Sequence, residues 1–176
     1  MSFYNLGIAP KIIETIGHLR FKTATPIQHK AIPLALEGQD IIGIAQTGTG
    51  KTMAFAIPMI QQLAQNKKHG LVLVPTRELA LQVEESIQKI AHPFNIRTVS
   101  LIGGDPIQNQ LRALAKNPRV IIATPGRLLD LMGQRKVRLN EVSILVLDEA
   151  DRMLDMGFAP QIEEIFKTIP KERQTM

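Results

Sequence analysis

The chain has 176 residues, no cysteine, a net charge of +5 at pH 7 and a hydrophobic content of 44%. This length suits one domain that buries roughly 70% of its unfolded surface without cross-links. The lack of cysteine excludes disulfides and thiolate metal sites, and it is compatible with a reducing cytoplasm, which is the location we expect. No apolar run approaches the roughly 18 residues of a membrane span, so no membrane partner is expected. The mild basic charge suits a polyanionic partner but is weak support by itself.

The predicted elements alternate between helices and short apolar strands. Helices come first, over 10–16 and 26–36. The strands that follow are mostly β-branched and nearly continuous in hydrophobicity, as in parallel sheets that are covered on both faces. These strands are expected at 40–45, 70–74, 97–102, 119–123 and 143–147, and further helices at 53–63, 76–91, 105–116, 125–132 and 160–168. Asp105, directly before Pro106, is expected to cap its helix. The order predicts an α/β fold with a doubly wound, mostly parallel sheet.

The strongest functional signal is the stretch DIIGIAQTGTGKT, in which an apolar strand leads into a glycine-containing loop and then a helix. Ile41, Ile42 and Ile44 are expected to be buried in that strand. Consecutive backbone N–H groups and a helix N-terminus together form a phosphate site. Lys51 is expected to reach the outer phosphates, and the Thr52 hydroxyl to hold Mg²⁺. The predicted nucleotide-binding residues of this loop are Ala45, Gln46, Thr47, Gly48, Thr49, Gly50, Lys51 and Thr52.

Two carboxylates, Asp148 and Glu149, directly follow the last predicted buried strand. Ligands of open α/β sheets bind at the carboxyl ends of the strands, so these side chains are expected to face the phosphate loop. Asp148 is expected to hold Mg²⁺ together with Thr52, and Glu149 to orient or deprotonate the attacking water. The alternative is an exposed acidic turn, which the phosphate loop makes less favoured. Lys51, Asp148 and Glu149 are therefore the candidate catalytic residues.

Three further strand ends carry small residues, hydroxyls or an arginine where a helix is expected to begin. Such places bind phosphates through N–H groups, hydroxyls and guanidinium. A single nucleotide needs only one such loop, so several of them suggest a row of phosphates, as in a nucleic acid strand. Because no aromatic platform for stacking bases is evident, backbone contacts with little sequence preference are expected. The candidate residues are Pro75, Thr76, Arg77, Gly103, Gly104, Thr124, Gly126 and Arg127, although Thr76 and Thr124 could each be simple helix caps.

Upstream of the phosphate loop, Gln28 offers a way to recognise the base. A glutamine amide can pair with the N6 and N7 edge of adenine, and Phe3 or Phe21 could stack on the ring. However, Thr25 and Gln28 also have the spacing of a capping box, and Pro26 behind Thr25 is a typical helix start. Spacing alone favours the cap.

In order, the chain contains FKTATPIQ, AQTGTGKT, PTRELA, a Gly-Gly pair, TPGR and DEAD, and over essentially its whole length it resembles the DEAD-box RNA helicases. The resemblance implies a single RecA-like P-loop NTPase domain over 1–176, the first of two such domains in an ATP-dependent RNA helicase. Residues 1–36 would form a helical Q-motif extension, and 37–176 the P-loop core. ATP and Mg²⁺ are the implied cofactors. RNA and a second RecA-like domain are the implied partners, and the isolated domain is expected to be monomeric.

The resemblance also implies roles for single residues. It assigns Phe3 to stacking on adenine, Gln28 to reading adenine instead of serving as the cap, and Thr25 to a place near the phosphates. Phe21 stays among the predicted nucleotide-binding residues. It assigns Asp151 to coupling between the nucleotide and RNA sites. The remaining motif residues keep the roles already given to them.

The sequence departs from the family pattern at its end. It stops before the Ser-Ala-Thr motif, and the second RecA-like domain with its arginine finger is not included. Arginine fingers are worth on the order of 10³ or more in rate. We therefore expect this piece alone to bind nucleotide weakly and to hydrolyse it very slowly. Two other functions remain open: a stand-alone module that binds ATP and RNA, and a P-loop kinase, although no acceptor pocket or basic lid is evident.

Overall fold

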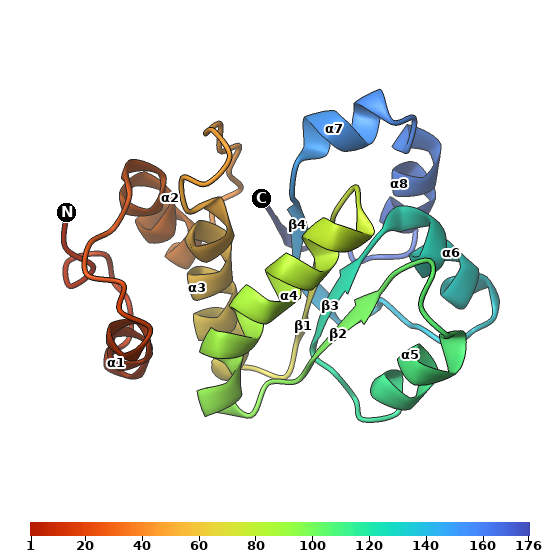
Figure 1. The fold of residues 1–176 in the computed structure, drawn as a ribbon, viewed down its shortest axis with the longest axis horizontal. Helices are drawn as coiled ribbons and strands as arrows, with labels where there is room; N and C mark the ends of the chain where they lie inside the picture. Colours follow the sequence, from red (N-terminus) through yellow and green to blue (C-terminus); the bar gives the residue numbers. More distant parts are fainter.

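Five parallel strands form the centre of the structure, a computed structural model that describes residues 1–176 (Figure 1). The strand order is β2-β3-β1-β4-β5. Leu73 at the end of β1 lies beside Ala123 at the end of β3 and Leu147 at the end of β4, so these strands end at one edge of the sheet. The strands are β1 (His69–Leu73), β2 (Thr98–Leu101), β3 (Val120–Ala123), β4 (Val142–Leu147) and β5 (Gln174–Thr175).

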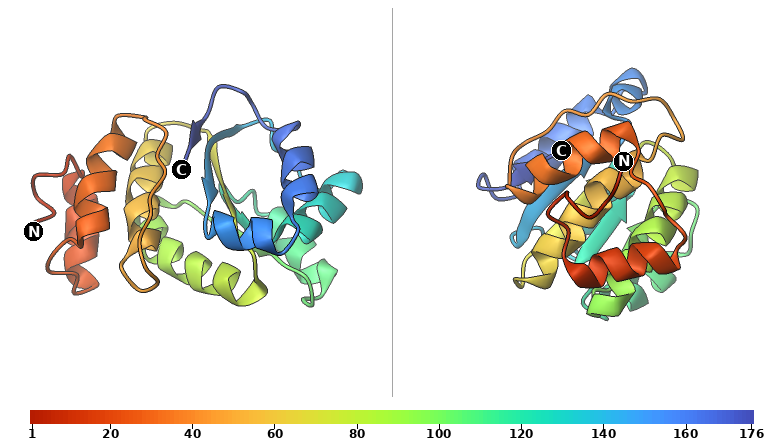
Figure 2. Two further views of the ribbon diagram at one scale, coloured as in Figure 1. Left: turned by 90° about the horizontal axis from the view of Figure 1, so that it is seen from above. Right: turned by 90° about the vertical axis from the view of Figure 1, so that its left-hand side faces the viewer.

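Helices cover both faces of the sheet (Figure 2). One face is covered by α3 (Lys51–Ala64) and α4 (Arg77–Ala91), and α1 (Pro10–His18) and α2 (Pro26–Leu36) pack outside them. The helices that complete the fold are α5 (Ile107–Leu114), α6 (Pro125–Gly133), α7 (Ala150–Asp155) and α8 (Ala159–Phe166), and a short 3₁₀ turn, η1, spans His92–Phe94. The predicted doubly wound α/β fold is confirmed, and its sheet is entirely parallel. No helix is long and apolar enough to span a membrane.

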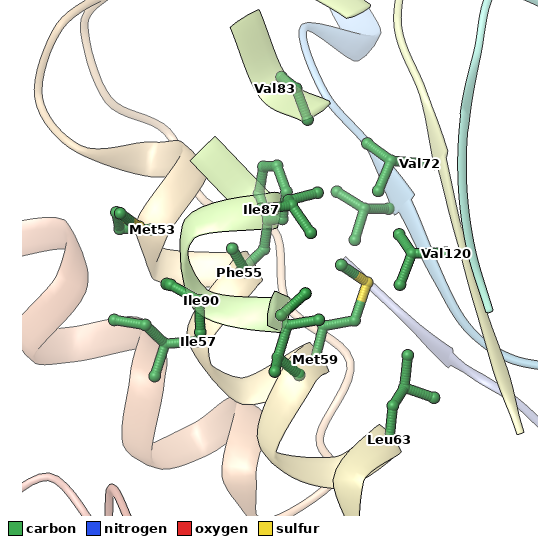
Figure 3. Packing of buried hydrophobic residues seen from close by; sticks show 14 of the residues in the cluster. Met53, Phe55, Ile57, Met59, Leu63, Val72, Val83, Ile87, Ile90 and Val120 are labelled. Atoms are coloured by element: carbon green, nitrogen blue, oxygen red, sulfur yellow. The ribbon is translucent and has the colours of Figure 1, made fainter. Parts of the chain in front are cut away.

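The strands are buried on both faces because successive side chains point to opposite sides. Val72 belongs to the larger apolar cluster, under α3 and α4, whereas Leu71 and Leu73 belong to the smaller one on the other face. Figure 3 shows the larger cluster, in which Met59 of α3 and Ile87 of α4 approach the sheet. Burying one such side chain contributes about 1.5–3 kcal/mol. This core fixes the loops that follow the strands.

The strand predicted at 40–45 is wrong. That segment has no strand pairing, and Ile42 and Ile44 are 94% and 93% exposed. Its neighbour at this side of the sheet is β5, which is two residues long. The contacts between them are Ile41 N–H donating to the Thr175 carbonyl at 3.1 Å, and Thr175 N–H donating to the Asp40 carboxylate at 2.8 Å. An apolar run needs a partner ladder to form a strand, and β5 offers only the beginning of one.

Smaller differences concern helix boundaries. The helix predicted from 105 begins at Ile107 and ends at Leu114, and Asp105 does not cap it because Pro106 occupies the N-cap position. Helix α7 and strand β5 were not predicted. In both cases the sequence pattern is short: α7 buries only Met153, and β5 is two residues long.

The exposure of the 40–45 segment leads to a stability prediction. Ile44→Ser is expected to change the free energy of unfolding of the chain by no more than about 0.5 kcal/mol, as surface substitutions do. Ile57→Ala, in the fully buried face of α3, is expected to cost about 2–5 kcal/mol. Urea denaturation of both variants measures the contrast. A loss of several kcal/mol in Ile44→Ser would show that the segment is buried after all.

Candidate nucleotide and phosphate-strand site

The phosphate loop requires glycine at its last position. Gly48 and Gly50 have positive φ angles, 79° and 88°, which side-chain-bearing residues rarely adopt. A Cβ atom on Gly50 would also lie 2.3 Å from Nε2 of Gln28. Gly50 is the N-cap of α3, so the helix begins at Lys51 and directs its free N–H groups toward the loop. The backbone of the loop therefore requires glycine at these positions, and the free N–H groups at the start of α3 are of the kind that a phosphate site uses.

Lys51 and Thr52 lie in the first turn of α3, where the sequence places them. The Lys51 ammonium donates a hydrogen bond to the carbonyl of Ala45 at 2.6 Å, which closes the loop on itself. The Thr49 hydroxyl donates in a similar way to the carbonyl of Gln46 at 2.5 Å. A bound phosphate would take the place of the Ala45 carbonyl as the partner of Lys51. The ammonium is thus already at the mouth of the loop.

Thr25 and Gln28 form the capping box that their spacing predicts. Gln28 Oε1 accepts from the Thr25 N–H at 3.0 Å, and the Thr25 hydroxyl accepts from the Gln28 N–H at 3.4 Å. The amide also reaches the phosphate loop, since Nε2 donates to the carbonyl of Gly50 at 3.1 Å. With 2% of its surface exposed, Gln28 links the start of α2 to the start of α3. Its role in adenine recognition remains a prediction.

Phe3 and Phe21 come together, but in different environments. Both line a groove of about 340 Å³ beside α1, to which Gln28 does not contribute. Phe3 is buried in the apolar cluster that includes Ile12 and Ile16, whereas Phe21 is substantially exposed. Of the two, Phe21 has the accessible ring face that stacking on a base requires.

The two carboxylates lie where β4 ends. Asp148 is buried, and its backbone N–H donates to the carbonyl of Leu73 at the end of β1. Burial raises the pKa of the Asp148 carboxyl, the charge of Glu149 adds to this, and the Lys51 ammonium and the Glu149 N–H oppose it. Because Lys51 acts on the pKa of Asp148, the first turn of α3 lies within electrostatic reach of this carboxylate.

Glu149 has an unusual backbone conformation. Its φ is 52° and its ψ is 49°, a left-handed region that costs a non-glycine residue of order 1 kcal/mol or more. The carboxylate is half-buried and forms an ion pair with Arg152 Nη1 at 3.2 Å. Such strain is typical of functional sites. The sequence did not indicate this role for Arg152, because the contact depends on α7, a helix that was not predicted.

The residues present fit a magnesium ion that is completed by phosphate. Mg²⁺ prefers oxygen ligands and commonly takes one or two from the protein, with water and substrate phosphates supplying the rest. The Thr52 hydroxyl, in the first turn of α3, and Asp148, directly after β4, offer such oxygens. The chain contains no group of three acidic or histidine side chains that could hold a metal without a substrate. This donor set matches a metal that arrives with the nucleotide.

The raised pKa of Asp148 predicts a specific dependence of stability on pH. Between the ordinary pKa of an aspartate and the raised folded pKa, the folded chain binds more protons than the unfolded chain, so the free energy of unfolding falls as pH rises through that window. Asp148→Asn removes the ionisable carboxyl and with it this decrease in the free energy of unfolding. The variant should therefore have a higher Tm at neutral pH in the absence of nucleotide. Thermal unfolding at several pH values measures it, with Asp151→Asn, an exposed carboxylate of α7, as the control. A lower Tm for Asp148→Asn at neutral pH would contradict the account.

The loops after β1, β2 and β3 meet at this same edge. Arg77 forms an ion pair with Asp105, its Nη2 lying 3.2 Å from the carboxylate. Gly104, with φ 82°, leaves room for the Arg77 guanidinium, since a Cβ there would lie 2.6 Å from Nη1. Arg127 Nη1 donates to the carbonyl of Asp105 at 3.3 Å and to Gln110 Oε1 at 3.1 Å. Two basic side chains, from the first turns of α4 and α6, are therefore tied to the loop after β2.

The other residues predicted for phosphate contacts lie around this network. Thr76 is a helix cap, because its hydroxyl accepts from the Leu79 N–H at 3.2 Å. Thr124 makes no capping bond, so its hydroxyl is available. Gly103 and Gly126 are exposed, whereas Pro75 is buried. Asp151 is exposed in the first turn of α7, and nothing in its contacts tests the coupling role predicted for it.

Two residues of this network were missed by the sequence reasoning. Asp105 was expected to cap a helix but serves as the partner of Arg77. Gln110 was not considered at all, although a polar residue on the inward face of an amphipathic helix was a visible signal, beside the partly buried Ile107 and Leu111.

Comparison with known proteins places the chain in a family. The family model described as DEAD/DEAH box helicase matches residues 25–176. The chain is 49% identical to the ATP-dependent RNA helicase CshA of Listeria monocytogenes, with 99% of the chain and 34% of that protein covered. It is 48% identical to the ATP-dependent rRNA helicase RRP3 of Debaryomyces hansenii, covering 99% of the chain and 37% of that protein. The chain thus spans about a third of the length of these relatives.

A solved structure agrees. A hypothetical ATP-dependent RNA helicase from Sulfolobus tokodaii superposes with a TM-score of 0.86 at 38% sequence identity, covering 94% of the chain and 48% of the other protein. The RecA-like fold that the sequence predicted is confirmed by this likeness and by the parallel sheet.

Proposed function

The chain belongs to the DEAD/DEAH box helicase family, and from this premise we propose that it is the ATP-binding RecA-like domain of an ATP-dependent RNA helicase that acts in the cytoplasm. The observation that carries the proposal is one shared edge of the sheet. The phosphate loop and Asp148 lie at this edge, and so do Arg77 and Arg127. A nucleotide and the sugar-phosphate backbone of a nucleic acid can therefore bind side by side.

At the nucleotide end, each residue has a defined task. The N–H groups of the loop and the Lys51 ammonium bind the phosphates. Thr52 and Asp148 hold Mg²⁺, which neutralises charge on the phosphates when bound. Glu149, held by Arg152, orients or deprotonates the water that attacks the outer phosphate. Phe21 and Gln28 are the residues that we propose to contact the adenine.

The part of the edge that we propose for RNA binds the RNA backbone. Its contacts come from Arg77, Arg127, the Thr124 hydroxyl and the exposed glycines. Because these groups recognise phosphate and sugar, little sequence preference is expected. A second RecA-like domain would close over the same edge, bend the bound strand and so separate it from its partner locally. Hydrolysis would then release the strand. The chain without that domain lacks the arginine finger, so it should hydrolyse ATP very slowly.

RNA-stimulated ATP hydrolysis tests the proposal. The full-length protein, meaning this chain joined to a second RecA-like domain, should hydrolyse ATP faster when single-stranded RNA is added. DNA of the same sequence serves as the matched control for nucleic acid specificity. A hydrolysis rate that is indifferent to RNA would contradict the proposal and would favour the kinase alternative, which needs no nucleic acid.

A further inference from the structure

We infer that Gln110 is a positioning residue for RNA binding: its buried amide fixes the Arg127 guanidinium in the orientation that grips the RNA backbone. The inference rests on the proposed function and adds a residue outside the motifs by which the family was recognised. Its basis is the set of hydrogen bonds between Gln110, Ile102, Asp105 and Arg127.

Gln110 is an exception on its helix. It is the single buried residue of α5, with 4% of its surface exposed, and the only polar side chain among the inward-facing residues of that helix. Burying an amide costs free energy unless both its ends are hydrogen-bonded. Here both are: Nε2 donates to the Ile102 carbonyl at 2.8 Å, and Oε1 accepts from Arg127 at 3.1 Å. An apolar residue would fill this place without forming either bond.

The two bonds make the amide directional. The Ile102 carbonyl, in the loop that follows β2, can only accept, so Nε2 must face it. Consequently Oε1 can only face Arg127. A glutamine in this position presents a fixed acceptor to the guanidinium, which neither a methionine nor a glutamate can do in the same way.

Arg127 is left with the donors that a phosphate needs. Its Nη1 group has two hydrogens, and these are taken by Gln110 Oε1 and by the Asp105 carbonyl. The Nε and Nη2 donors form no hydrogen bond within the protein and are not among its buried, unpartnered atoms. Nε and Nη2 form the side of the guanidinium that binds phosphate oxygens in a bidentate manner. The inward side is thus held, and the outward side is available.

The position of Arg127 on its helix also favours phosphate binding. It lies in the first turn of α6, whose N-cap residue Thr124 makes no side-chain capping bond. The backbone N–H groups at the start of this nine-residue helix are therefore not occupied by a side-chain cap and lie in the same turn as Arg127. Because Asp105 also pairs with Arg77, the network joins the starts of α4 and α6 into one phosphate-binding surface.

The test measures the affinity of the full-length protein for a fluorescently labelled oligouridine over a range of salt concentrations. Gln110→Met, which is close in size, is expected to weaken binding about tenfold, because a hydrogen bond to a charged group is lost. The slope of log affinity against log salt should also decrease by roughly 0.7, which corresponds to one phosphate contact on a single strand. Gln108→Met, an exposed glutamine on the same helix, is the matched control and should change neither.

A double-mutant cycle separates positioning from a merely structural role. In an Arg127→Met background, Gln110→Met should have no further effect on RNA affinity, and nucleotide affinity should stay unchanged throughout. Equal effects of Gln110→Met with and without Arg127, or an unchanged salt slope, would overturn the inference. If Gln110→Met does not fold, Gln110→Glu replaces it: its carboxylate would neutralise Arg127, so the slope should again fall, and an unchanged slope would overturn the inference. Failure of the unaltered protein to bind RNA would instead refute the proposed function.

Discussion

Lys51→Ala is expected to abolish measurable nucleotide binding, with an affinity loss on the order of 100-fold. The Lys51 ammonium already lies at the mouth of the phosphate loop, bonded to the Ala45 carbonyl, and it is the one side-chain cation that acts on the pKa of Asp148. Without it, the phosphates lose the charged hydrogen-bond donor of the loop. Titration with a fluorescent ATP analogue measures the loss.

Lys67→Ala is the matched control for this prediction, because Lys67 is an exposed lysine in the loop after α3. It should bind nucleotide as the unaltered chain does. Nucleotide affinity that survives in Lys51→Ala would mean that the loop is a structural turn and that the phosphates bind elsewhere.

Glu149→Gln is expected to spare ATP binding and to reduce hydrolysis by about 10²–10⁴-fold in the full-length protein, the usual contribution of a positioned base. Glutamine keeps the shape of the side chain and can still accept the bond from Arg152 Nη1. It cannot take a proton from the attacking water. Nucleotide affinity and single-turnover hydrolysis, measured in parallel, separate the two effects.

The control for Glu149→Gln is Glu163→Gln, in which an exposed glutamate of α8 is replaced. It should affect neither binding nor hydrolysis. Unchanged turnover in Glu149→Gln would remove Glu149 from the mechanism, whereas loss of ATP binding would show that the residue acts mainly on the shape of the site, through its left-handed backbone.

Much of the fold could be predicted from local patterns. The strands β1, β3 and β4 are short apolar runs, and a segment of that kind has few alternatives to a covered parallel sheet. The same reasoning failed at 40–45, where the residues have strand composition but Ile42 and Ile44 remain exposed. Composition reports what a segment would bury, whereas strand formation depends on a partner, and β5 forms only a two-residue ladder.

The nucleotide site was more predictable than the site proposed for the RNA backbone, because the residues of the nucleotide site are neighbours in the sequence. The loop, Lys51 and Thr52 follow one another in the sequence, and so do Asp148 and Glu149. For Gln28, spacing correctly indicated the capping box, but it could not reveal the bond to the Gly50 carbonyl, 22 residues further along the chain. Spacing says nothing about which distant backbone group an amide will meet.

The network proposed to bind the RNA backbone depends on contacts between residues far apart in the sequence, which no local pattern encodes. Asp105 was predicted to cap a helix, but the chain instead places it beside Arg77, 28 residues earlier. The bond between Gln110 and Arg127 likewise joins α5 to α6 across β3. These contacts arise because parallel strands bring successive loops to one edge of the sheet. The sequence could place each loop at that edge but could not pair the side chains within it.

Hydrogen exchange of the chain with and without ligands tests the central claim most directly. The claim is that nucleotide and RNA bind along a single edge of the sheet. ATP with Mg²⁺ should slow exchange at 46–52 and 148–149, and single-stranded RNA should slow it at 103–105 and 124–127. Neither ligand should protect the groove at the opposite edge, lined by Gln88, His92, Arg97 and Lys116. RNA protection at that opposite groove, with none at 103–105 and 124–127, would contradict the account.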